Sequence, residues 1–220
     1  MRTTVDGGVT VSELERLISQ EDLRAAQRFH GNVCVPLAVG LKMSYVAMQE
    51  LGVSRAADRE ISAVVEVGDH HWASCLLDGV QWATGCTLGK ENLRIEPLGK
   101  FAMTLIEASS RRAVRISWRP EFIEQALQWP LVVAKREGRS DYRPAAGEVA
   151  ALIEDVLGGD AREQLTVRRM EGYALAKAKM AFDGFRCSGC GEFVMAPFAR
   201  EIDGQMYCLA CYKHALHQGL

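Results

Sequence analysis

Cys187-Ser188-Gly189-Cys190 and Cys208-Leu209-Ala210-Cys211 are two CxxC pairs near the end of the chain, separated by seventeen residues (191–207). A CxxC turn brings two thiolates close enough to ligate one tetrahedral Zn²⁺ ion, and two such pairs complete a four-sulfur shell. The sequence therefore predicts a zinc site made of Cys187, Cys190, Cys208 and Cys211. Redox-active pairs or buried free thiols are the alternative, but a thioredoxin-like site needs one pair in a βαβ setting.

The residues around these cysteines indicate how the module folds. Asp203-Gly204 is a hairpin turn signal between two short strand-like runs, and a helix is expected from Cys208 onward. A knuckle, a hairpin and a helix whose first turn supplies the last two ligands form a treble-clef zinc finger, which we expect over residues 181–220. Because four cysteines leave no open coordination position, this zinc is expected to stabilise structure and not to catalyse a reaction.

Residues 1–180 are expected to form one α+β core domain, with the boundary between about Gly172 and Phe185. The capping box Thr10-Val11-Ser12-Glu13 predicts a helix that starts near Val11. Apolar periodicity predicts further helices over 36–51, 72–83 and 147–157 and one from Pro120, and strands at 61–67, 101–108 and 113–118. Helices come first, then a strand and a hairpin, and this order favours an α+β fold over a regular βαβ winding.

The charge balance and the lack of long apolar segments limit the classes of partner. The chain has 26 Lys and Arg against 28 Asp and Glu, which provides no global field to recruit nucleic acid or an anionic membrane. No stretch approaches the ~18 apolar residues of a membrane span, and the N-terminus lacks a secretory signal. We therefore expect a cytoplasmic protein without a membrane or nucleic-acid partner, whose seven cysteines serve metals or chemistry.

The three other cysteines lie beside polar groups where predicted helices begin or end. Cys34 follows His30 at a helix start, where the helix dipole is expected to lower the pKa of its thiol. Cys75 and Asp78 are three apart on one predicted helix and so share a face. Cys86 is followed by the cationic Lys90. Each feature alone is weak, because a buried cysteine is commonly a small hydrophobe.

Taken together, these segments resemble the FmdE-like family, which takes its name from a product of the formylmethanofuran dehydrogenase operon. The resemblance covers about residues 25–118 and extends to the tail, since some members carry the same treble clef. It implies an α+β core with a small mixed sheet and flanking helices, an intertwined homodimer, and a metal or active site. The segments that match in order and spacing are Phe29-His30-Gly31-Asn32-Val33-Cys34, Cys75-Leu76-Leu77-Asp78-Gly79-Val80-Gln81 and Thr84-Gly85-Cys86-Thr87-Leu88-Gly89-Lys90-Glu91-Asn92.

Carried over by position, the family site consists of His30, Cys34, Cys75, Asp78 and Cys86, with Lys90 beside them. This chain departs from the family pattern in three places. Asn32 stands where the family has a second histidine, Glu91 replaces the second glycine after the lysine, and Cys34-Val35-Pro36 replaces Cys-Pro-Gly. His70 and His71, in a polar loop, could supply a substitute imidazole or could simply be solvated.

Three functions are compatible with these features. The leading hypothesis is a metal-binding accessory protein linked to molybdenum or tungsten formylmethanofuran dehydrogenase and one-carbon metabolism. Its metal would be held by His30, Cys34 and Cys75, and a metalloenzyme or another protein would be its partner. A thiol-dependent enzyme is the second, with Cys34 or Cys75 activated by His30 or Lys90 and with Asp78 orienting the base. The third is a zinc-finger regulator or protein-interaction module, although the tail has no basic stripe.

Overall fold

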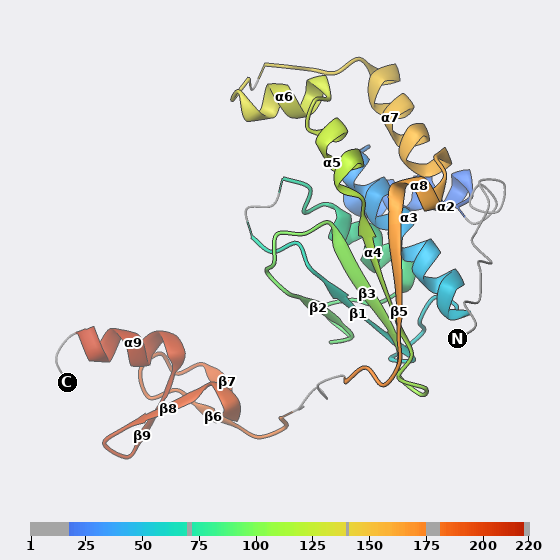
Figure 1. Ribbon diagram of the computed structural model, residues 1–220. Helices are drawn as coiled ribbons and strands as arrows, with labels where there is room; N and C mark the ends of the chain where they lie inside the picture. The colour runs from blue at the N-terminus through green and yellow to red at the C-terminus, as the bar shows by residue number, and fades with distance from the viewer. Residues whose placement is uncertain (1–17, 70–71, 140, 175–180, 218–220) are drawn as a thin grey trace. The chain divides into compact units, whose positions relative to one another are not determined.

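The computed structural model describes residues 18–69, 72–139, 141–174 and 181–217, and the chain divides into two compact units, residues 1–175 and 176–220 (Figure 1). The expected helix start near Val11 lies outside the described residues. Among the helices described, none is both long and apolar enough to cross a lipid bilayer.

The first unit is built on a five-stranded mixed sheet. Its strand order is β2-β1-β3-β4-β5, with β1 and β2 parallel and the other neighbours antiparallel. The strands are β1 (Ile61–Val65), β2 (Leu93–Ile95), β3 (Ala102–Glu107), β4 (Ala113–Trp118) and β5 (Leu165–Met170). The α+β prediction with a small mixed sheet is confirmed. β2 was missed because it is only three residues long and follows a polar loop.

Helix α3 (Val35–Leu51) is the centre of this unit. It is buried along most of its length, and with α4 (Leu76–Thr84) it packs against one face of the sheet (Figure 1). The predicted helix over 72–83 is wrong at its start, because residues 72–75 form turns. The other helices of the unit are α2 (Gln20–His30), α5 (Pro120–Ala126), α6 (Pro130–Arg136), α7 (Ala146–Gly158) and α8 (Ala161–Gln164).

Two glycines allow α3 and α4 to cross with their backbones in contact. A Cβ atom at Gly40 would lie 2.0 Å from the carbonyl oxygen of Leu76. One at Gly79 would lie 2.3 Å from the carbonyl oxygen of Leu37. Any side chain at either position would therefore push the helices apart. The crossing lies within about two turns of Cys34 and Cys75, which precede the two helices.

Lys42 of α3 is buried, and its ammonium group is held at the end of α7. Nζ donates to the carbonyl oxygens of Val156 at 2.8 Å and Gly159 at 2.5 Å, and to the side chain of Gln164. The C-terminal end of a helix offers unpaired carbonyls and a dipole that favours a cation. Burial nevertheless lowers the pKa of Lys42 to about 8, and the charge of Asp160 opposes this shift.

This lowered pKa predicts that stability depends on pH. A lysine in the unfolded chain titrates near 10.5, so between pH 8 and 10.5 the unfolded state binds more protons and the free energy of unfolding rises with pH. Relative to a Lys42→Met variant, we expect the wild type to gain at most about 3 kcal/mol across this range. Urea denaturation of both proteins followed by tryptophan fluorescence measures the difference. A difference that is constant or falls with rising pH would contradict the lowered pKa.

The second unit consists of two hairpins and a helix. Strands β6 (Gly184–Arg186) and β7 (Phe193–Met195) form the first hairpin, and β8 (Ala199–Ile202) and β9 (Gln205–Cys208) form the second, with the 3₁₀ turn η1 (Ala196–Phe198) between them. Asp203 and Gly204 both have positive φ, 48° and 75°, as a type I′ hairpin turn requires. Helix α9 (Leu209–His217) follows, so the order of elements is that of the expected treble clef.

Candidate metal centres

A cluster in the first unit joins His30, Cys34 and Cys75. A ring nitrogen and two sulfurs lie within 4.8 Å of one another, and the three residues are partly buried. His30 ends α2, Cys34 is the residue that caps the start of α3, and Cys75 holds the same position before α4. Gly31, at φ 96°, ends α2 immediately after His30, so the chain turns sharply between the two ligands. The cluster therefore depends on three helix ends meeting at one point.

Asp78 orients the imidazole of the cluster. One turn after Cys75, its Oδ2 lies 2.7 Å from Nδ1 of His30, and its Oδ1 accepts from Nε2 of Gln81 at 3.2 Å. Because a carboxylate only accepts, Nδ1 carries the proton of this hydrogen bond and a neutral ring keeps its lone pair on Nε2. A carboxylate on the second ring nitrogen is the usual support of a metal-binding histidine.

The thiol of Cys34 is not activated for nucleophilic attack. Burial raises its pKa to about 11, and the neighbouring thiol of Cys75 adds to the rise, while a backbone hydrogen bond from Leu37 opposes it. The expectation that the helix dipole would lower this pKa is wrong, because loss of solvation outweighs the dipole. A protonated thiol at neutral pH is a poor nucleophile, whereas a bound cation would stabilise its thiolate.

Cys86 and Lys90 belong to a different network. Cys86 is completely buried, its Sγ donates to the carbonyl of Ile61 at 3.5 Å, and burial raises its pKa to about 11. Nζ of Lys90 donates to the carbonyls of Ala56 and Ala57, both at 3.3 Å. The structure thus places these two predicted site residues where they join the 84–92 loop to the segment before β1.

The departures from the family pattern have different structural settings. Glu91, where the family has glycine, adopts a left-handed backbone with φ 56°, a conformation that glycine adopts at lower cost. Asn32 is exposed in the loop between His30 and Cys34. His70 and His71 lie outside the described residues.

A pocket of roughly 310 Å³ opens beside the core cluster. His30, Cys75 and Asp78 line it together with a set of apolar side chains that the sequence alone did not indicate, namely Leu77, Leu88, Leu93 and Ile95. Their signal was weak, since Leu88 is a single apolar residue in a polar loop and Ile95 lies on the short strand β2.

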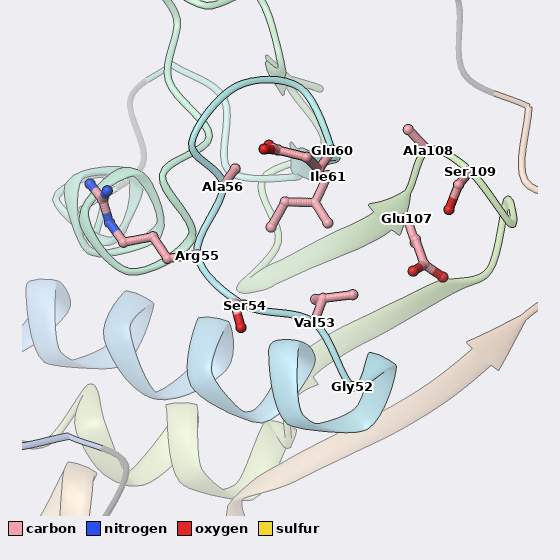
Figure 2. Close-up of a pocket in the computed structure, with 10 residues that line it drawn as sticks. All are labelled: Gly52, Val53, Ser54, Arg55, Ala56, Glu60, Ile61, Glu107, Ala108 and Ser109. Carbon is pink, nitrogen blue, oxygen red and sulfur yellow. The ribbon is translucent and has the colours of Figure 1, made fainter.

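A larger pocket of roughly 750 Å³ lies between the end of α3 and the start of β1 (Figure 2). Its carboxylates, Glu60 and Glu107, point in different directions in Figure 2. Both are engaged by nearby groups: Glu107 pairs with Arg112 at 2.7 Å, and Glu60 accepts from the backbone N–H of Asp58 at 2.9 Å. Among the residues described, those lining this pocket include no cluster suited to a metal.

The second unit gathers Cys187, Cys190, Cys208 and Cys211, whose sulfurs all lie within 4.8 Å of one another. Backbone N–H groups point at these sulfurs, from Cys208 to Cys187 at 3.2 Å and from Cys211 to Cys208 at 3.4 Å. Hydrogen bonds from the backbones of Cys190 and Cys208 lower the pKa of Cys187 to about 6. Gly189 is needed here, because a Cβ would lie 2.9 Å from Sγ of Cys211. The cluster could bind zinc.

These features define an α+β protein with a histidine-cysteine cluster in its core unit and a four-cysteine cluster in its tail. The family model described as FmdE, molybdenum formylmethanofuran dehydrogenase operon, matches residues 29–165. The chain belongs to this FmdE family, as its signature segments predicted.

Two known proteins are similar to this chain. A protein of Archaeoglobus fulgidus named as a probable S-adenosyl-L-methionine-binding protein is 34% identical over 210 residues, covering 91% of this chain and 53% of its own length. The chain thus spans about half the length of that relative. The solved structure of a tungsten formylmethanofuran dehydrogenase FmdE-like protein from Syntrophus aciditrophicus has a TM-score of 0.56 and 21% identity, with 94% of each chain covered. At that identity the likeness concerns the fold.

Proposed function

We propose that this protein is a metal-binding accessory protein linked to molybdenum or tungsten formylmethanofuran dehydrogenase and one-carbon metabolism. Its core cluster would handle a metal or metal-containing cofactor, and its tail would hold a structural zinc. The observation that carries the proposal is the meeting of His30, Cys34 and Cys75 within 4.8 Å, with Asp78 supporting the imidazole.

The two clusters differ in the coordination that they offer. One nitrogen and two sulfurs suit zinc and other soft or borderline transition metals. Three protein ligands leave a tetrahedral ion with an open position, which allows exchange or the binding of a further ligand. Four cysteines in the tail close the shell, as in structural zinc sites. The core site is therefore the one suited to handling a metal.

The thiol-enzyme alternative receives less support, because burial raises the pKa of the Cys34 thiol to about 11. The family suggests a homodimer with a metalloenzyme or another protein as partner. Both clusters require reduced thiols, which is consistent with a cytoplasmic location.

Metal analysis of the purified full chain tests the proposal. We expect about two metal ions per chain in the wild type and about one after serine replaces Cys187, Cys190, Cys208 and Cys211. Adding Cys34→Ser and Cys75→Ser to this variant is expected to remove the remaining ion, because two of three ligands are lost.

Cys86→Ala is the matched control, since it removes a buried thiol outside both clusters and is expected to leave the metal content unchanged. Circular dichroism shows whether each variant is folded. A tail variant that is folded and free of metal would contradict a core site. A core ion that survives the loss of Cys34 and Cys75 would contradict the ligands named here.

A further inference from the structure

The open side of the core cluster is adjacent to an apolar wall. Two of the three candidate ligands, His30 and Cys75, line the pocket of roughly 310 Å³, and Leu88 and Ile95 line it as well. These two side chains are 56% and 38% exposed. Single exposed apolar residues are common on protein surfaces, but these share one pocket with metal-binding groups.

The polar side chains of this pocket are largely engaged within the protein. Asp78 binds His30 through one oxygen and Gln81 through the other. Gln81 also accepts from the backbone N–H of Leu88 at 3.4 Å. The pocket therefore offers a ligand two kinds of recognition: coordination at the metal, and apolar contact with the wall of Leu77, Leu88, Leu93 and Ile95.

We propose that the core site binds a small molecule that has an anionic, metal-coordinating head and a short apolar chain. This inference rests on the proposed function, since the head needs a metal at His30, Cys34 and Cys75. The head would bind as its anion in place of water, its proton passing to solvent, and the chain would lie against Leu88 and Ile95. Ligand affinity would then increase with the apolar area that the wall covers.

A series of hydroxamates on the Co²⁺-loaded full chain tests this. Acetohydroxamate, butyrohydroxamate and hexanohydroxamate share one head and differ in chain length, and the visible d–d absorption of Co²⁺ reports binding. The Cys34→Ser/Cys75→Ser variant provides the spectrum of the tail site for subtraction. We expect affinity to rise by up to about fourfold for each added methylene.

Two leucine variants separate contact with the wall from general apolar attraction. Leu88→Ser is expected to remove most of the dependence on chain length while acetohydroxamate binding stays unchanged. Leu98→Ser is the matched control, because Leu98 is 52% exposed and lies outside the residues that line this pocket, so it should preserve the full series.

Several outcomes would overturn the inference, and they differ from failure of the proposed function. An affinity that is the same for all three hydroxamates excludes the apolar wall as a ligand surface, and no spectral change with any of them excludes the open position. A flat series, together with weaker self-association of Leu88→Ser in sedimentation, would assign the wall to a second copy of the chain. If the core binds no Co²⁺ at all, the proposed function itself fails.

Discussion

Gly79→Ala is expected to destabilise the core unit by about 3 kcal/mol and to abolish metal binding at the core cluster. The new methyl group would lie 2.3 Å from the carbonyl oxygen of Leu37, so α4 would have to move away from α3. Cys34 and Cys75 immediately precede these two helices, and the displacement would separate their sulfurs. The effect is large because the atom that is met is backbone, which cannot rotate aside.

Urea denaturation and metal content of the full chain measure both effects. The four-serine tail variant is the suitable background, because every remaining metal ion then belongs to the core. Gly147→Ala is the matched control: Gly147 lies in α7, its added Cβ would meet nothing within 4 Å, and the change should be neutral or slightly stabilising. If Gly79→Ala matched this control in stability and metal content, the helix crossing would not determine the site.

Removal of zinc from the tail is expected to unfold residues 181–217 while the core unit stays folded. Cys187 is the single buried residue among those of the tail whose burial the structure describes, 181–216, so apolar burial contributes little to the module. Structural zinc sites contribute roughly 10–16 kcal/mol in comparable small modules. A chelator, or Cys208→Ser, should therefore cause loss of the whole tail structure and not a local change.

Hydrogen exchange measured by mass spectrometry distinguishes the two units. We expect tail amides to lose protection on chelation while those of α3 and β3 keep theirs. Ser188→Ala serves as the control, because Ser188 lies in the same knuckle and makes its described hydrogen bond through the backbone N–H, to Met206. Tail amides that stay protected after the metal has been removed would mean that the hairpins fold without it.

Long periodic segments of the core were predicted well from sequence. The helix expected over 36–51 is α3 (Val35–Leu51), and the strand expected over 113–118 is β4 (Ala113–Trp118). Short elements were missed: β2 has three residues and is defined by pairing with β1, and α6 (Pro130–Arg136) has two turns. Such elements exist through tertiary contacts more than through intrinsic preference.

Local spacing alone was enough to identify the cysteines of the tail, since two CxxC turns and a hairpin signal bring four thiols together over a short stretch of chain. It also indicated that His30 and Cys34 belong together, because one tight turn connects them. The sequence by itself did not show that Cys75 joins them, that Cys86 points elsewhere, or that Leu88 and Ile95 line the same pocket. Those placements follow from the contact of α3 with α4 at Gly40 and Gly79 and from the position of β2 at the sheet edge, and non-local packing of this kind leaves no periodic signal in the chain.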